Sequence, residues 1–342
     1  MLQAMWQKFV DWLKSAAGLT VMAAIVLTVI TTLDRGPYIL VNTVVTGGML
    51  ALISVGLAMV FGVLNIPQFA HGEYFMIGGL AAYVVFRPLE GLVKASPGTL
   101  FALSAPLIAI LAALLAGALA GAVTEVLAIR PLRKRARQNW VMNSFLLTVG
   151  ISVVLINGHQ MILGVEFKGI DRFYSGMPLD FFGAFVSRDR IFAVILSFVL
   201  IVAFWLFMSR TKTGRAIRAV SQDETGAMMV GIPLDSITML TMAIGCALAA
   251  VAGASLLFLY PTYPTVGMEP LYMAWFVVIL VGLGNVIGAL VGGFMVGLAK
   301  VLTIEYIGTG WEYVVPTCLI ILVLIIKPNG IFGTEVRGVL DQ

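Results

Sequence analysis

Long apolar runs separated by short polar segments organise this chain of 342 residues. A membrane-spanning helix needs about 20 predominantly apolar residues. The runs lack the alternation of every second residue that marks a membrane barrel, so they predict helices. The expected spans are 17–33, 38–63, 66–86, 100–128, 140–163, 190–208 and 237–259, then a long region at 271–304 and a last span at 311–327. The pattern therefore predicts an all-α, polytopic membrane helix bundle of roughly 8–10 spans.

Composition agrees with this pattern. Hydrophobic residues make up 60% of the chain and charged residues 11%, whereas a soluble domain carries roughly 25% charged residues. Most of the exterior must therefore face lipid, which makes the chain an integral membrane protein. Because the sequence contains no linker, low-complexity run or clear internal repeat, we expect a single transmembrane domain over residues 1–342.

Two polar connections are rich in basic side chains. They are Arg130, Arg133, Lys134, Arg135 and Arg137 in the first connection, and Arg210, Lys212, Arg215 and Arg218 in the second. Short loops rich in Lys and Arg are retained on the cytoplasmic side of a membrane. Both clusters adjoin apolar spans, which argues against nucleic-acid binding. The alternation of spans then places residues 164–189 and 260–270 outside and the N-terminus inside.

The long apolar region at 271–304 is expected to be broken. Lys327 lies inside only if this region crosses the membrane twice, and its sequence GLGNVIGALVGG is rich in glycine. We therefore predict a broken or re-entrant pair of helices, with the break or close helix packing at Gly282, Gly284, Asn285 and Gly288. Small residues of this kind let membrane helices approach closely.

The first residues resemble a targeting segment but lack its cleavage site. Lys8 and Lys14 precede an apolar run, yet no small-x-small site occurs before Asp34. Residues 2–14 carry apolar side chains at helical spacing, which predicts an interfacial helix lying on the membrane. The run that follows is read as an uncleaved span.

The stretch NIPQFAHGE, residues 65–73, places polar side chains between two apolar runs. Pro67 and Gly72 imply non-helical backbone that protein or water shields, since backbone polar groups in lipid must be satisfied. The site residues predicted to line or gate a translocation path are Asn65, Gln68, His71 and Glu73. An interfacial turn whose His71 and Glu73 cap helix ends is the alternative. One histidine beside one glutamate does not match a zinc-hydrolase motif, so no metal site is expected.

The segment 209–236 is too polar to span a membrane. Within 214–224, Ile217 and Val220 share one side of a helix, while Arg215, Arg218 and Gln222 share another. This predicts a short amphipathic helix at the cytoplasmic face, ended by glycines 226 and 231. It is either a solvated loop helix or a docking element that enters a groove on a cytoplasmic partner.

Residues 260–270, YPTYPTVGMEP, are stiff and aromatic and lie outside. An interfacial aromatic belt is the ordinary interpretation, and a contact surface for an extracytoplasmic protein is the alternative. Cys246 and Cys318 lie in apolar segments and act as small hydrophobes, so neither a disulfide framework nor a metal cluster is expected.

Enzyme motifs are absent from the sequence. No GxxxxGK[ST], GxSxG, HExxH or CxxC occurs; GGFMVGLAK has the wrong spacing for a phosphate-binding loop. We therefore expect no enzyme and no bound cofactor in this chain.

Four motifs together resemble the permease subunits of branched-chain amino-acid ABC importers. They are FGVLNIPQFAHGEYFMIGG, TGRAIRAVSQDETGAMMVGI, VGLGNVIGALVGG and KPNGIFG, which cover most of the chain from about residue 40 onward. In the first motif Phe69, Ala70, His71, Gly72 and Glu73 match the family's Asn-Phe-Ala-His-Gly-Glu core, and Gln68 replaces its Asn. Asn285 stands where relatives often have Ser, and the N-terminal segment is additional.

This resemblance implies an importer of several parts in the bacterial inner membrane. The expected partners are a second, related permease subunit, two cytoplasmic ATPases that bind ATP and Mg, and a periplasmic substrate-binding protein. The coupling residues carried over are Gly214, Arg215, Arg218, Asp223, Glu224 and Gly231. The chain looks like the first of the two permease types. Branched-chain amino acids are the implied substrate, while related permeases also carry urea, short amides or aromatic acids.

The rival function class is a stand-alone secondary transporter or channel driven by an ion gradient. His71 and Glu73 would then act as a proton site inside the membrane. An intramembrane enzyme is a third reading, but it lacks a nucleophile–base motif. Uptake that needs ATP rather than a proton gradient separates the first two classes.

Overall fold

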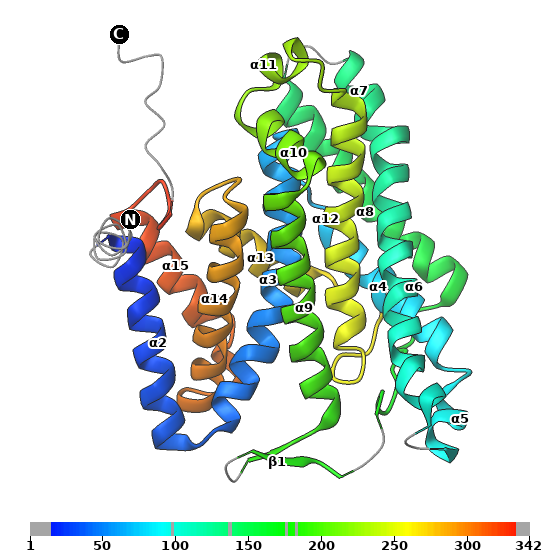
Figure 1. Ribbon diagram of the computed structural model, residues 1–342, viewed down its shortest axis with the longest axis vertical. Coiled ribbons are helices and arrows are strands. Elements are labelled where there is room, and N and C mark those ends of the chain that lie inside the picture. The colour runs from blue at the N-terminus through cyan, green and yellow to red at the C-terminus, as the bar shows by residue number, and fades with distance from the viewer. Residues whose placement is uncertain (1–14, 97–98, 136–138, 175–176, 182–183, 333–342) are drawn as a thin grey trace.

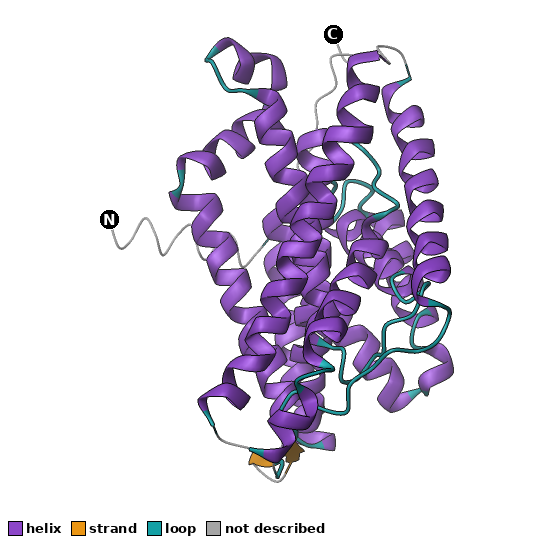
Figure 2. Cartoon of the chain, turned by 90° about the vertical axis from the view of Figure 1, so that its right-hand side faces the viewer, coloured by secondary structure: helices purple, strands orange, loops and turns teal. Residues whose placement is uncertain are grey.

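The computed structural model describes residues 15–96, 99–135, 139–174, 177–181 and 184–332. The interfacial helix predicted over residues 2–14 lies outside the described residues, as do Arg137 and the chain beyond Phe332. The regular structure of the described chain is helical apart from one two-stranded sheet, and loops join these elements (Figure 2).

The elements follow one another in chain order. The helices are α2 (Ala16–Arg35), α3 (Tyr38–Leu64), α4 (His71–Phe86), α5 (Glu90–Ala95), α6 (Leu100–Thr124), α7 (Arg130–Arg135), α8 (Trp140–Leu163), α9 (Arg188–Arg210), α10 (Lys212–Gln222), α11 (Glu224–Met229), α12 (Leu234–Ser255), α13 (Met268–Val281), α14 (Val286–Tyr306) and α15 (Val314–Ile326). A π-helical turn, Glu125–Ile129, joins α6 to α7, and a 3₁₀ turn, Thr309–Trp311, precedes α15. The strands β1 (Leu179–Phe181) and β2 (Ala184–Val186) pair antiparallel.

The all-α membrane bundle predicted from the sequence is confirmed. Eight described helices are long and apolar enough to cross a membrane, and α13 is a shorter apolar helix. The long region at 271–304 is divided into α13 and α14, as expected from its glycines. The prediction of a span starting at residue 66 is wrong, because α4 begins at His71; the span predicted over 237–259 runs over 234–255 instead.

The two ends of the bundle differ in character (Figure 1). α7, α10 and α11, which hold the basic connections, lie at one end, and β1 and α5 lie at the opposite end. α2 starts, and α15 stops, on the side of the basic connections. The two basic connections thus lie on one side of the bundle, as the alternation of spans requires, and the positive-inside rule predicts that this side is cytoplasmic.

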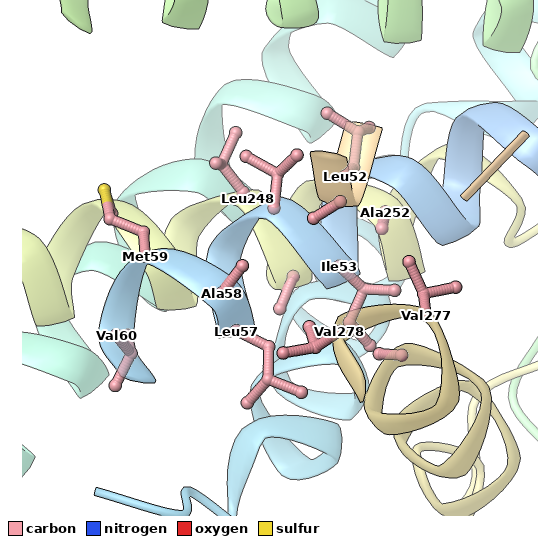
Figure 3. Packing of buried hydrophobic residues seen from close by; sticks show 14 of the residues in the cluster. Leu52, Ile53, Leu57, Ala58, Met59, Val60, Leu248, Ala252, Val277 and Val278 are labelled. Carbon is pink, nitrogen blue, oxygen red and sulfur yellow. The ribbon is translucent and has the colours of Figure 1, made fainter. Parts of the chain in front are cut away.

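Helix α3 forms the centre of the bundle. It is apolar on every face, and a helix of that kind is expected to be buried all round. Its residues pack against α12 and α13 in the main core, where Ile53 and Leu57 meet Val277 and Val278 (Figure 3). α14 and α9 also contact α3. The segment that follows α3 is therefore anchored to the most enclosed helix of the protein.

Several helices approach so closely that a side chain would not fit between them. A Cβ on Gly78 of α4 would lie 1.9 Å from the carbonyl oxygen of Ala250 in α12, and a Cβ on Gly253 would lie 2.1 Å from that of Phe75. Dispersion contacts between such backbones stabilise helix pairs in lipid, where the hydrophobic effect between helices is absent. α4 and α12 are thereby held as one unit.

The outermost helices expose apolar surface. Leu33 of α2 and Ile162 of α8 are each 81% exposed, and Ile325 of α15 is 78% exposed. A water-soluble surface rarely carries contiguous apolar patches of this extent. Lipid or another membrane chain covers these faces, in line with a multi-pass membrane protein.

Candidate functional site

A six-residue connection turns the chain from α3 into α4 within the bundle. Asn65 ends α3 with a left-handed backbone, φ 52°. Residues 66–70 are not helical, and His71 opens α4. The predicted non-helical backbone around Pro67 is confirmed, but Gly72 lies inside α4. The absence of a side chain at Gly72 instead lets α4 approach Gly267 closely, since a Cβ there would stand 2.4 Å from the carbonyl oxygen of Gly267.

Gln68 and His71 form a buried polar pair. The Gln68 Oε1 lies 3.2 Å from His71 Nδ1, and His71 Nε2 lies 3.2 Å from the carbonyl oxygen of Ile53 in α3. Gln68 Nε2 also donates to the sulfur of Cys246 in α12 at 3.8 Å. Both side chains have 0% exposure. They hold the connection between α3 and α12 and satisfy polar groups that would otherwise be costly in a dry interior.

Glu73 points toward α8 from the first turn of α4. Its Oε1 accepts a hydrogen bond of 2.8 Å from Ser152, while its buried Oε2 has no hydrogen-bond partner in the described chain. The neighbouring Phe69 stacks on Trp275 at 5.4 Å between ring centroids. Glu73 is 3% exposed and Asn65 is exposed. The structure thus brings Gln68, His71 and Glu73 into the interior and leaves Asn65 at its edge; their part in a path or gate stays a prediction.

The cytoplasmic segment forms two helices joined at Asp223. α10 buries Ile217 and Val220, as predicted, and exposes Arg215 and Arg218. The expectation that Gly226 ends a helix is wrong, because Asp223 caps α11 by accepting a hydrogen bond of 3.0 Å from the Gly226 backbone. Gly231, at φ 83°, follows the end of α11. The segment is therefore an ordered hairpin of helices.

The base of this hairpin is tightly fitted to α9. A Cβ on Gly214 would lie 2.4 Å from the carbonyl oxygen of Phe207, and Thr211 caps α10 by accepting a hydrogen bond of 2.9 Å from the Gly214 backbone. α10 packs on α9, α12 and α3. Displacement of α10 would thus act on three spanning helices at once. Asp223 and Glu224 are exposed on the same hairpin.

A cluster of charges that the sequence pattern does not mark as a site joins the first basic connection to α12. Glu125, in the π-helical turn, is fully buried; its Oε1 lies 3.7 Å from Arg133 and accepts a hydrogen bond of 2.9 Å from Thr238. Arg133 and Lys134 both pair with Asp235 at the start of α12. A π-helical turn often marks a functional position in a helix. In the sequence, the signal for this cluster was Glu125, an acidic residue in an apolar run just before the basic connection.

The break between α13 and α14 is held by the C-terminal segment. Asn285 caps α14 by accepting a hydrogen bond of 2.8 Å from Gly288, and its Nδ2 donates to the carbonyl oxygen of Phe332 at 3.2 Å. Ile331 donates its backbone N–H to Leu280 at 2.7 Å. Gly282 and Gly284 have positive φ angles of 104° and 79°. The break is confirmed as an ordered turn, with Gly288 already inside α14.

The aromatic segment 260–270 packs on the loop that follows α8. Thr262 and Lys168 exchange two backbone hydrogen bonds of 2.9 and 2.8 Å, which joins residues 260–267 to the loop after α8. Tyr263 stands edge-on to Phe167 at 4.8 Å. Burial raises the pKa of Tyr263. Among the described residues, no group of three or more His, Cys, Asp or Glu side chains is arranged to hold a metal ion.

The sequence matches one family model and several proteins that are named as transport permeases. Residues 39–324 match the model described as branched-chain amino acid transport system / permease component. The chain is 31% identical over 297 residues to the high-affinity branched-chain amino acid transport system permease protein LivH of Salmonella typhimurium, covering 85% of this chain and 94% of LivH. It is 31% identical over 301 residues to the corresponding protein BraD of Pseudomonas aeruginosa, covering 86% and 94%.

A relative with a different name is less similar. The probable branched-chain amino acid transport permease protein LivM of Methanocaldococcus jannaschii is 26% identical over 324 residues, covering 83% of this chain and 90% of LivM. No solved structure matches this chain.

Proposed function

Because the chain belongs to the family of branched-chain amino acid transport system permease components, we propose that it is a membrane-spanning permease subunit of an ABC importer. In this role it forms part of the path for branched-chain amino acids, in the bacterial inner membrane. The observation that carries the proposal is the match over residues 39–324. The ordered hairpin of α10 and α11 supports it, because such an importer needs a segment that can contact an ATPase.

We propose that ATP is bound and hydrolysed, with Mg, on two partner ATPases rather than on this chain. α10 and α11 would enter a groove on an ATPase, with Arg215, Arg218 and Glu224 facing it, because a short amphipathic helix with one buried face suits groove binding. Gly214 sets the hairpin against α9, and Gly231 lets the chain turn back after α11.

The movement would then spread from the hairpin into the span. α10 rests on α9, α12 and α3, and α3 leads into the connection that contains Gln68 and ends at His71. A rocking of these helices against a second permease would alternate access between the two sides of the membrane. The second subunit is expected to be a related chain, and a periplasmic binding protein would deliver the substrate outside.

Co-purification with transport tests the proposal. A tagged chain expressed together with the other subunits of its importer should co-purify with a P-loop ATPase. Vesicles containing the assembled complex should take up leucine with ATP and loaded binding protein, and uptake should survive collapse of the proton gradient. If this chain alone concentrates leucine, or if uptake follows the proton gradient without ATP, the proposal fails and the ion-coupled transporter is favoured.

A further inference from the structure

Lys300 is a charged residue in the interior of a spanning helix. It lies in α14 and is 8% exposed. A buried ionisable side chain in a membrane span is costly, and such residues generally line a pathway or pair with one another. The role of Lys300 is not explained by the cytoplasmic hairpin or by the connection after α3. The groups around Lys300 indicate what its charge interacts with.

A negative side chain stands close to Lys300, with one tyrosine between them. Lys300 Nζ donates to the hydroxyl of Tyr313 at 3.1 Å, and that hydroxyl donates to Glu269 Oε2 at 2.5 Å. The ammonium also lies 4.4 Å from the centre of the Tyr313 ring and 3.6 Å from Glu312 Oε2. The positive Lys300 on α14 and the negative Glu269 on α13 are thus two hydrogen bonds apart, with Tyr313 at the start of α15 between them.

The same groups line a cavity. Its volume is about 160 Å³, and its wall combines Lys300, Glu269 and Tyr313 with apolar side chains of α3, α4 and α13. The apolar wall includes Met49, Leu50, Phe75 and Met273 on these helices, and Val266 in the loop before α13. For comparison, a cavity of about 150 Å³ holds a benzene molecule. The space therefore suits one branched aliphatic side chain.

The cavity is placed on the external side of the bundle. Phe167, Tyr260 and Pro261, which belong to the segments assigned to the outside, line it as well. Tyr260 is 50% exposed and Phe167 is 71% exposed, so both rings are accessible. A molecule released at this face would reach the cavity without crossing the core around Gln68 and His71, which has no exposed surface.

We propose that this cavity is the outer binding site of the permease for a zwitterionic amino acid with an apolar side chain. The proposal rests on the function proposed above and adds the residues that receive the substrate. The α-carboxylate pairs with Lys300, and the α-ammonium pairs with Glu269. The aliphatic side chain lies against Met49, Phe75 and Met273. Charge-assisted bonds at both ends select a zwitterion, since a ligand that lacks one of the two charges forgoes the stronger bond at that end.

Photolabelling of the complete transporter tests this site. Membrane vesicles with all subunits receive a leucine analogue that carries a diazirine in its side chain, and labelled peptides are mapped by mass spectrometry. Label is expected on the helices that hold Met49, Phe75 and Met273. Lys300→Gln and Glu269→Gln should each reduce it by at least about tenfold, since each removes a charge-assisted hydrogen bond. Glu269 is exposed, so its variant leaves the fold intact.

Matched variants and competitors sharpen the result. Arg188→Gln and Glu166→Gln remove exposed external charges outside the cavity lining and should label like the unmodified protein. Leucine should compete in excess, whereas 3-methylbutylamine, which lacks the carboxylate, and 4-methylpentanoate, which lacks the amine, should not. Equal competition by all three, or label unchanged in both cavity variants, overturns the site. Unmodified vesicles that take up no leucine overturn the proposed function instead.

Discussion

Arg133 and Asp235, 102 residues apart in the sequence, are joined by a hydrogen bond of 2.8 Å between the end of α7 and the start of α12. The bond closes a cluster in which the buried carboxylate of Glu125 is the central charge. The cluster fixes the cytoplasmic end of α12 beside α10. It therefore belongs to the part of the bundle through which a movement of the hairpin would pass.

Arg133→Ala should destabilise the protein strongly. Loss of Arg133 leaves the buried Glu125 with Arg130, 3.9 Å away, as its remaining cation. Breaking a buried pair completely typically costs about 3–5 kcal/mol, so we expect a loss toward the lower end of that range. The melting temperature of the purified complex measures the effect. Arg135→Ala, which changes an exposed arginine on the same helix, should have little effect. Adding Glu125→Gln to Arg133→Ala should recover part of the loss; if it does not, Glu125 is not the charge that Arg133 neutralises.

Gly214→Ala should loosen the cytoplasmic hairpin. The new Cβ would meet the carbonyl oxygen of Phe207 at 2.4 Å and the Cα of Met208 at 2.6 Å, so the backbone must shift. We expect weaker retention of the ATPase in pull-down experiments. Gly150→Ala is the control, because a Cβ there has no neighbour within 4 Å. Equal retention in both variants would contradict a fitted joint at Gly214.

Combined replacement of Arg215 and Glu224 by alanine should uncouple transport. Both side chains are exposed, so stability should change little, as for other surface substitutions. ATP hydrolysis by the reconstituted complex should then no longer rise in step with leucine uptake. Arg188→Ala, at the other end of α9, serves as the control. Hydrolysis and uptake that stay fully linked in the double variant would remove these residues from the coupling contact.

Asn285→Ala should destabilise the start of α14. It removes the cap on Gly288 and the bond to Phe332, and loss of an N-cap costs about 0.5–2 kcal/mol. Asn285→Ser keeps a capping oxygen and should lose less. Hydrogen exchange over residues 286–290 reports the difference, with faster exchange in the alanine variant. Identical exchange in the two variants would show that capping is not what Asn285 contributes.

The external helix α5 should loosen at acid pH. Burial would raise the pKa of the Glu90 carboxyl, but hydrogen bonds from Lys94 and Arg87 outweigh it and lower that pKa. Lys94 likewise lowers the pKa of Asp171 by a hydrogen bond. A carboxyl with a lowered folded-state pKa adds stability above its unfolded-state value of about 4.3 for Glu, and that stability is lost as the pH falls further.

Hydrogen exchange of residues 89–95 at successive pH values checks this expectation. Protection should be constant near neutral pH and fall only below about pH 4, where the carboxyls take up protons. Glu90→Gln should remove most of the pH dependence. A loss of protection that begins near neutral pH would assign the effect to other groups.

The sequence was sufficient for most of the helix layout because burial in lipid demands long apolar runs, and these are visible without knowledge of contacts. It also located the break at Gly284 and Asn285 and the apolar stripe of α10. Helix ends were less accurate: α4 starts five residues later than expected, since Pro67 lengthens the connection. The local pattern also assigned Gly226 to a helix end, although the Asp223 cap starts α11 there.

The sequence pattern could not predict which distant segments contact each other. The pairing of Gln68 with Cys246 depends on how α4 lies against α12, and their separation of 178 residues gives no periodic signal. The same is true of Lys300, Tyr313 and Glu269, which three elements bring together. Lys300 alone could have been noticed, as a single lysine in the apolar run 286–306.

The bonds from Ile331 and Phe332 to the last carbonyls of α13 have a practical consequence for handling the protein. Leu280 and Val281 receive them 2.7 and 3.2 Å away, so a stretch that looks like an expendable tail completes an internal turn. Trimming the chain after α15 would remove hydrogen-bond donors from the turn between α13 and α14.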